Sequence, residues 1–461
     1  MIDQIDKNSN KIKLNKKTNS FFERTFNKLE AAWRGIAGST YDANIASSRP
    51  NLPNDDLELL RIQMLNCLET RGGEVKARGR AAALGHVYLA LSPSGRKRFL
   101  DLLANEFGID ETSVNSAMKN LQNAISKEER YLARFDLKKS LIAPRIKLLT
   151  QFNALPDGVK FLVDMRAELI SLKSKETTLL ELEYDLKEIL TSWFDVDFLE
   201  LRQITWNNAS AALLEKLIAY EAVHEIDGWD DLKNRLDSDR RCFGYFHPRM
   251  PDEPLIFVEV ALVNGMEGKI ENLLDEGAPV LDPYNSDTAI FYSISNAQKG
   301  LAGISFGNFL IKRVANTLSS EFNGLKTFAT LSPIPGFIMW LDMKSNEELE
   351  NILTNKAVAS LKNISRKGDS IEQSLRFNLK INKWYLNKSI SEALRVPLMC
   401  LCAYYLIYEK DKNMRALDPV AHFHLTNGAQ LEKINWLADI SSKGIEKSAS
   451  MMINYVYDLS R

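Results

Sequence analysis

Cysteine is scarce in this sequence and provides no framework for holding the chain together. Four cysteines occur in 461 residues, at Cys67, Cys242, Cys400 and Cys402. They are too few and too widely spaced for a disulfide scaffold or a zinc knuckle. We therefore expect all four thiols to stay reduced.

Net charge and long apolar runs are missing as well. The 59 Lys and Arg residues nearly cancel the 60 Asp and Glu residues, so no bulk field draws the protein to nucleic acid or to an anionic membrane. The longest apolar run, 396–408, falls short of the ~20 residues that a membrane-spanning helix needs. We expect a buried helix there, opened by Pro397, and neither nucleic acid nor a membrane as a partner.

Neither end of the sequence resembles a targeting signal. Residues 1–17 are polar, rich in Asn and Lys, and contain acidic residues, which is typical of neither a secretory signal nor an acidic-poor transit peptide. The last three residues, Leu459, Ser460 and Arg461, differ from the peroxisomal Ser-Lys-Leu address. We expect a cytoplasmic protein whose residues 1–19 form a flexible leader.

The remaining pattern indicates two domains. Residues 20–191 place apolar side chains at helical spacing, for example at Leu57, Leu60 and Met64, which predicts an all-α helical bundle. Residues 192–461 instead alternate strand candidates with helices, which is typical of an α/β domain. The fold class that we predict is therefore α+β, with two domains. The strand candidates are 241–246, 255–262, 289–295 and 327–331, and a polar helical insertion is expected at 345–388.

A glycine-rich turn separates the last two strand candidates. It contains Gly300, Gly303 and Gly307 and leads into a predicted helix that begins near Asn308, a suitable N-cap. Glycines let several backbone N–H groups point into one concavity, and a helix N-terminus adds partial positive charge, so this combination binds phosphate. The turn has neither the P-loop nor the dinucleotide-binding spacing, so a plain strand-to-helix connection stays open as the alternative.

Residues that can perform acid–base chemistry lie in two further segments. Strand 327–331 delivers Ser332 into a proline turn, and His422 and His424 lie a short distance before the C-terminus. One imidazole paired with the Ser332 hydroxyl can move a proton near neutral pH. A metal site would instead use both histidines with Asp418, if the segment were extended. A third interpretation is that these histidines, like His247, only hydrogen-bond turns.

Four segments together resemble the malonyl-CoA decarboxylase family. They are FHPRMPDEPLIFVEVAL (246–262), GLAGISFGNFLIKRV (300–314), LSPIPGF (331–337) and DPVAHFHLTNGAQLEKINWLAD (418–439), in that order along the chain. All of them lie in the C-terminal part, and the helical N-terminal half agrees with the family only in its architecture.

The resemblance implies a helical oligomerisation domain, forming a tetramer or dimer, followed by a catalytic domain with the N-acetyltransferase superfamily fold. It implies that Ser332 and His424 are catalytic and contact malonyl-CoA, with His424 as proton donor. The glycine turn would hold the CoA pyrophosphate. Its residues are Ala302, Gly303, Ile304, Ser305, Phe306, Gly307 and Asn308.

The implied reaction is decarboxylation of malonyl-CoA to acetyl-CoA and carbon dioxide, in fatty acid or malonate metabolism. A thioester accepts the electron pair released with carbon dioxide, so the resemblance implies no metal and no organic cofactor. We expect Tyr457 and Asn427 as helpers, and the resemblance gives His422 no role. The alternative is an acyl-CoA-dependent N-acetyltransferase, which would use the same fold and CoA turn but require an acceptor amine.

Overall fold

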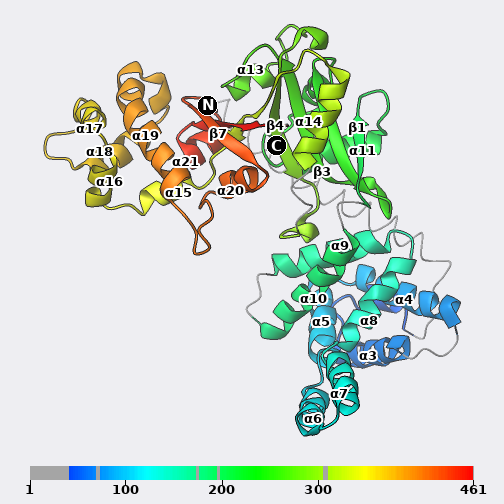
Figure 1. Ribbon diagram of the computed structural model, residues 1–461. Coiled ribbons are helices and arrows are strands. Elements are labelled where there is room, and N and C mark those ends of the chain that lie inside the picture. Colours follow the sequence, from blue (N-terminus) through cyan, green and yellow to red (C-terminus); the bar gives the residue numbers. More distant parts are fainter. Residues whose placement is uncertain (1–40, 69–72, 173–175, 195–197, 305–309, 460–461) are drawn as a thin grey trace. The chain divides into compact units, whose positions relative to one another are not determined.

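The computed structural model describes residues 41–68, 73–172, 176–194, 198–304 and 310–459 (Figure 1). The chain forms two units. A helical unit contains the residues up to Leu199 together with His247–Glu253 and Gln298–Ser305, and a sheet unit contains Glu200–Phe246, Pro254–Ala297 and Phe306–Arg461. The predicted mixture of a helical N-terminal region and a later region with a sheet is confirmed. The predicted leader, 1–19, lies outside the described residues.

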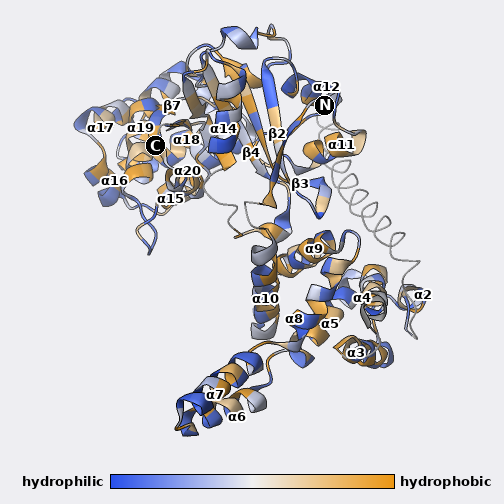
Figure 2. Ribbon diagram, turned by 45° about the vertical axis from the view of Figure 1, so that its right-hand side comes forward, coloured by the Kyte–Doolittle hydropathy of each residue, from blue (hydrophilic) through white to orange (hydrophobic). Residues whose placement is uncertain are grey.

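The helical unit is built from amphipathic helices whose apolar faces meet. In α3, Leu60 and Met64 are buried, as their spacing predicts. Helix α9 is buried over most of its length, and its apolar residues are orange in Figure 2. The described helices of this unit are α2 (Ala43–Ser48), α3 (Asn54–Leu68), α4 (Gly73–Ala90), α5 (Pro93–Glu106), α6 (Glu111–Asn123), α7 (Lys127–Ser140), α8 (Pro144–Gln151), α9 (Gly158–Ser171) and α10 (Thr177–Trp193).

Helices α6 and α7 form a pair that projects from the other helices of this unit (Figures 1 and 2). On α7, Tyr131, Leu132 and Phe135 are 71%, 60% and 61% exposed. Large apolar side chains on a surface favour association with another surface. Self-association through the helical unit stays a prediction.

The strands of the sheet unit make one sheet in the order β1-β2-β3-β4-β5-β8-β6, with β7 beside β8. The four predicted strands are confirmed as β2 (Arg240–His247), β3 (Met250–Val263), β4 (Thr288–Asn296) and β5 (Thr327–Thr330). Four others were not predicted, namely β1 (Glu200–Ile204), β6 (Ser332–Pro333), β7 (Ala429–Asn435) and β8 (Met452–Tyr457). β1 and β7 are mostly polar and partly exposed, so they lack the apolar run on which the strand assignments relied.

A helix crossover and a C-terminal strand bring the site together. β4 and β5 are parallel and are connected through α14 (Leu310–Glu321), which buries one apolar face made of Leu310, Ile311, Val314, Ala315 and Leu318. The predicted helix start at Asn308 lies outside the described residues. β8 then pairs antiparallel with both β5 and β6. Residues near 330 and residues near 455 are therefore neighbours.

The apolar run 396–408 belongs to α19 (Lys388–Tyr408), but Pro397 does not open this helix as predicted. It lies inside the helix, where proline cannot donate a hydrogen bond to the carbonyl group four residues earlier. That group, on Ala393, accepts a hydrogen bond from the Ser360 hydroxyl at 2.9 Å instead. This contact accounts for a helix that continues through its proline.

By length and composition α19 is the one described helix that could cross a membrane, and half of its apolar window is buried inside the structure. The predicted insertion is helical. The remaining helices of the sheet unit are α11 (Ala211–Tyr220), α12 (Trp229–Arg235), α13 (Ile270–Leu274), α15 (Phe337–Asp342), α16 (Asn346–Ile352), α17 (Asn355–Lys362), α18 (Ile371–Leu379), α20 (Pro419–Thr426) and α21 (Ser442–Ser448).

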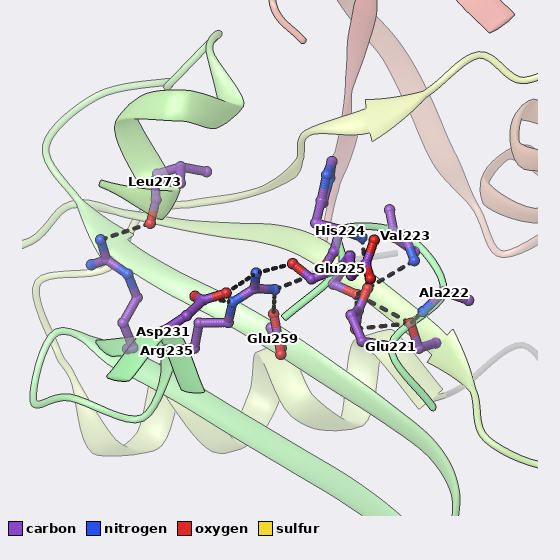
Figure 3. A network of polar contacts seen from close by, with 12 residues as sticks. Glu221, Ala222, Val223, His224, Glu225, Asp231, Arg235, Glu259 and Leu273 are labelled. Atoms are coloured by element: carbon purple, nitrogen blue, oxygen red, sulfur yellow. Dashed lines mark hydrogen bonds and ion pairs between the residues drawn. The ribbon is translucent and has the colours of Figure 1, made fainter. Parts of the chain in front are cut away.

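A buried charge network joins α12 to the sheet (Figure 3). Arg235 contacts Asp231 at 2.8 Å and Glu259 of β3 at 3.2 Å, and it also donates to the backbone carbonyl groups of residues 224 and 225. Burial raises the pKa of Glu259 to about 8, and Arg235 opposes this rise. Removing one partner of such a network would leave an unpaired buried charge.

His224, beside this network, makes the sheet unit sensitive to acid. Burial lowers its pKa from 6.5 to about 3, and Arg235 and Lys443 add to this shift. In the unfolded chain the ring of His224 takes up a proton below about pH 6.5, whereas in the folded chain it stays neutral down to about pH 3. The free energy of unfolding therefore falls as the pH drops from 6.5 toward 3. Between about pH 7 and pH 5 the free energy of unfolding should fall in both proteins. We expect the fall in His224→Gln to be about 2 kcal/mol smaller than that in the wild type.

Urea unfolding at the two pH values measures this difference. The comparison cancels the change of packing, which is the same at both pH values, and it also cancels the titration of Glu259. If the free energy of unfolding falls by the same amount in both proteins, the His224 ring has the same pKa in the folded and the unfolded chain.

Candidate active site

Ser332 is held at a rigid point of the sheet unit. It opens the short strand β6, where it lies opposite Ile453 of β8, and its side chain is buried. The turn that follows passes so close to α19 that an added Cβ at Gly336 would lie 2.2 Å from the Tyr405 hydroxyl. Any larger residue there would have to displace the Tyr405 hydroxyl. The serine hydroxyl is thus fixed from both sides, by the sheet and by the turn.

Helix α20 carries His424 to this serine. Its N-cap, Asp418, accepts hydrogen bonds through Oδ1 from two backbone N–H groups of the first turn. The other oxygen, Oδ2, accepts from the Gly336 N–H at 3.2 Å. One buried carboxylate therefore links the beginning of α20 to the turn after Ser332.

The structure brings Ser332 and His424 into direct contact. The Ser332 hydroxyl lies 3.0 Å from Nε2 of His424, and Nδ1 of the same ring lies 2.8 Å from the Tyr457 hydroxyl. On its other side, the Ser332 hydroxyl donates to Oγ1 of Thr330 at 2.8 Å. Four side chains that come from β5, β6, α20 and β8 form one hydrogen-bonded chain.

These four hydrogen-bonded side chains are buried, and burial decides whether the ring and the tyrosine hydroxyl are charged. Desolvation lowers the pKa of His424 to about 3, so the ring is neutral near neutral pH in the free protein. The ring stacks on Tyr455, with centroids 4.5 Å apart. Burial raises the pKa of Tyr457, so its hydroxyl keeps its proton. A neutral imidazole has one N–H and one bare nitrogen, which suits it to pass a proton along the chain.

Strand β8 fixes the Thr330 end of the chain. The backbone N–H of Tyr455 donates to Thr330 Oγ1 at 3.2 Å, and Nδ2 of Asn454 donates to the Thr330 carbonyl oxygen at 2.7 Å. Asn435 of β7 in turn donates to Oδ1 of Asn454 at 2.6 Å. Residues of β7 and β8 thus hold Thr330 in place.

The glycine turn is described only in part, because Ser305, Phe306, Gly307 and Asn308 lie outside the described residues. Gly303 has φ +72, in the region that favours glycine. The N–H groups of Ala302 and Ile304 donate to carbonyl groups of the same turn, at 3.1 Å each. These two amides are therefore already used within the turn, and phosphate binding at this segment stays a prediction.

Two cations of the helical unit lie beside this turn. Arg166 donates to the carbonyl oxygens of Gly300 and Ala302, at 2.6 and 2.9 Å. Nζ of Lys187 would lie 3.5 Å from a Cβ added at Gly303. Neither residue could be singled out from the sequence, because both come from helices far earlier in the chain.

The metal alternative required an extended segment, and the structure has a helix there. In α20, side chains two positions apart point in different directions, so His422 does not share the direction of His424. Asp418 is used as the helix N-cap. In the described parts of the chain no cluster of three His, Cys, Asp or Glu side chains converges as metal ligands do.

The other two candidates have structural contacts. His247 accepts from the Arg249 N–H through Nδ1 at 3.1 Å and contacts the Trp193 carbonyl oxygen through Nε2 at 3.0 Å. His247 therefore hydrogen-bonds a turn, as the third interpretation of the histidines states. Asn427 donates to the Phe423 carbonyl oxygen at 2.7 Å at the end of α20.

Comparison with known proteins identifies the relatives of this chain. The family model described as malonyl-CoA decarboxylase C-terminal domain matches residues 197–461, and the corresponding N-terminal domain model matches residues 107–194. The mitochondrial malonyl-CoA decarboxylase of Anser anser anser is 35% identical over 444 residues, which cover 93% of this chain and 86% of the relative.

Solved structures agree with these matches. The crystal structure of malonyl-CoA decarboxylase from Rhodopseudomonas palustris is 38% identical with a TM-score of 0.78, over 87% of this chain and 93% of the other. The enzyme from Agrobacterium vitis is 36% identical with a TM-score of 0.74, over 87% of this chain and 92% of the other.

Proposed function

The chain belongs to the malonyl-CoA decarboxylase family and is an enzyme of that family, and from this premise we propose a reaction path. Malonyl-CoA is decarboxylated to acetyl-CoA and carbon dioxide through a thioester enolate, without a metal or an organic cofactor. The observation that supports this path best is the buried contact of 3.0 Å between Ser332 and His424, with Tyr457 on the far ring nitrogen.

This reaction requires only two contributions from the protein. The bond between the carboxylate carbon and the methylene carbon breaks, and its electron pair moves onto the thioester as an enolate. Carbon dioxide leaves, and the enolate carbon takes up one proton to become the methyl group of acetyl-CoA. The thioester carbonyl itself accepts the electrons, so the protein must only stabilise the enolate oxygen and supply the proton.

The residues of the hydrogen-bonded chain can divide these tasks. His424 supplies the proton from Nε2, and Ser332 hydrogen-bonds the malonyl group at its fixed position. Tyr457 can return a proton to the ring through Nδ1, because its hydroxyl lies 2.8 Å away.

The CoA portion would be held along residues 302–308, of which Ala302 and Gly303 lie near Arg166 and Lys187. A cation and a helix N-terminus both favour phosphate. We also propose the N-acetyltransferase superfamily fold for the sheet unit, in agreement with its mixed sheet and with the helix between parallel β4 and β5.

Incubation of the purified protein with malonyl-CoA alone tests the reaction. We expect acetyl-CoA and carbon dioxide to form without any acceptor amine, and we expect a chelator to leave the rate unchanged. In deuterated water, protonation of the enolate should add a single deuterium to the methyl group of acetyl-CoA, which mass spectrometry detects.

Three results would contradict parts of the proposal. Consumption of an acyl-CoA only after an amine is added would favour the acetyltransferase alternative. Loss of activity with chelator, restored by a divalent ion, would show that a metal takes part. Acetyl-CoA without deuterium would rule out an enolate that takes its proton from groups in exchange with water.

A further inference from the structure

Thr330 contacts the catalytic pair from the side that faces away from His424. Its side chain is completely buried, and it lies two residues before Ser332 at the end of β5. Its Oγ1 accepts hydrogen bonds from two donors, the Ser332 hydroxyl at 2.8 Å and the Tyr455 backbone N–H at 3.2 Å. Because the Tyr455 donor belongs to the backbone of β8, it cannot turn away from Thr330.

The direction of the first of these bonds decides the others. A serine hydroxyl has one hydrogen, and that of Ser332 is given to Thr330. Ser332 then has only lone pairs for His424, so Nε2 must carry the hydrogen in the contact of 3.0 Å. A neutral ring protonated on Nε2 has a bare Nδ1, which can only accept, and the Tyr457 hydroxyl donates to it at 2.8 Å.

We propose that Thr330 is a positioning residue: by taking the hydrogen of Ser332, it holds the His424 ring in the form protonated on Nε2. Its catalytic consequence rests on the proposed function, in which Nε2 gives its proton to the enolate carbon. Without the Thr330 hydroxyl, Ser332 turns its hydrogen toward Nε2. The ring then carries its hydrogen on Nδ1, donates to Tyr457, and has no proton on the side of the substrate.

Two variants at this position separate the hydroxyl from the rest of the side chain. Thr330→Val keeps the branched shape and loses the acceptor, whereas Thr330→Ser keeps the acceptor and loses a methyl group. Thr288→Val is the matched control, because it removes another buried hydroxyl, one that donates to Asp287 at 2.7 Å on the neighbouring strand β4.

The ring form is measured directly, without turnover. In protein labelled with ¹⁵N-histidine, a protonated and a bare ring nitrogen have clearly different chemical shifts, and His424→Asn identifies the signals of this ring among the five histidines. We expect wild type, Thr330→Ser and Thr288→Val to show hydrogen on Nε2, and Thr330→Val to show it on Nδ1. In kinetics, kcat of Thr330→Val should fall at least ~10-fold with KM nearly unchanged, whereas Thr330→Ser should stay near the wild type.

Each other outcome has a definite meaning. Hydrogen on Nδ1 in the wild type overturns the proposal, also if Thr330→Val fails to fold. A folded Thr330→Val whose His424 ring still carries its hydrogen on Nε2 overturns the proposal as well. So does a Thr330→Val whose ring carries its hydrogen on Nδ1 while kcat stays at the wild-type value. If the wild type makes no acetyl-CoA, the proposed function fails, while the ring form still tests the role of Thr330.

Discussion

The variant His424→Asn is expected to turn over malonyl-CoA at least ~100-fold more slowly than the wild type, because it loses a general acid. Asparagine keeps a donor and an acceptor at about the position of Nδ1, so Tyr457 keeps a hydrogen-bonding partner, whereas Ser332 loses the contact that Nε2 makes. It cannot pass a proton from one side to the other, however, since an amide does not titrate near neutral pH. The enolate would then depend on water for its proton.

The same variant should bind CoA esters almost as tightly as the wild type, because the CoA portion is held elsewhere. Steady-state kinetics of acetyl-CoA formation gives kcat, and calorimetry with acetyl-CoA gives the dissociation constant. His422→Asn is the control, since it makes the same exchange on the same helix, at a half-buried side chain that faces another way. Near-normal turnover of His424→Asn would remove His424 from the mechanism.

Local sequence signals predicted the scaffold of this site better than its contacts. Ser332 could be singled out because an apolar strand ends there and a proline turn follows, and both features are local. The apolar face of α14 was equally visible, since five buried residues repeat at helical spacing. That Ser332 and His424 meet could not be read from spacing, because 92 residues separate them. Their pairing depended on the family resemblance.

The rest of the site comes from long-range pairing, which leaves no trace in spacing. Thr330 and Tyr455 belong to different strands, and only the pairing of β5 with β8 makes them neighbours. The strand β8 was missed, although its alternating Tyr455 and Tyr457 point to one face, as residues two apart in a strand do. Pro397 misled the prediction because its effect is offset by Ser360, a residue on another helix.

Replacement of Ser332 by Ala is also expected to lower kcat at least ~100-fold, since an oriented hydrogen-bonding group at the reacting atoms is worth that much. The change removes the oxygen that lies between Thr330 and His424, at 2.8 and 3.0 Å. Nε2 of the ring would lose its partner, and the malonyl group would lose a hydrogen bond at a fixed position. Binding of acetyl-CoA should change little.

A general loss of folding would lower kcat as well, so a second serine is needed for comparison. Ser374→Ala removes an equally buried hydroxyl from α18, where it contacts Ser365 at 2.7 Å. Both variants should unfold at similar urea concentrations, and only Ser332→Ala should lose turnover. A Ser332→Ala protein that unfolds like the control and still makes acetyl-CoA at the wild-type rate would mean that the enolate forms without this hydroxyl.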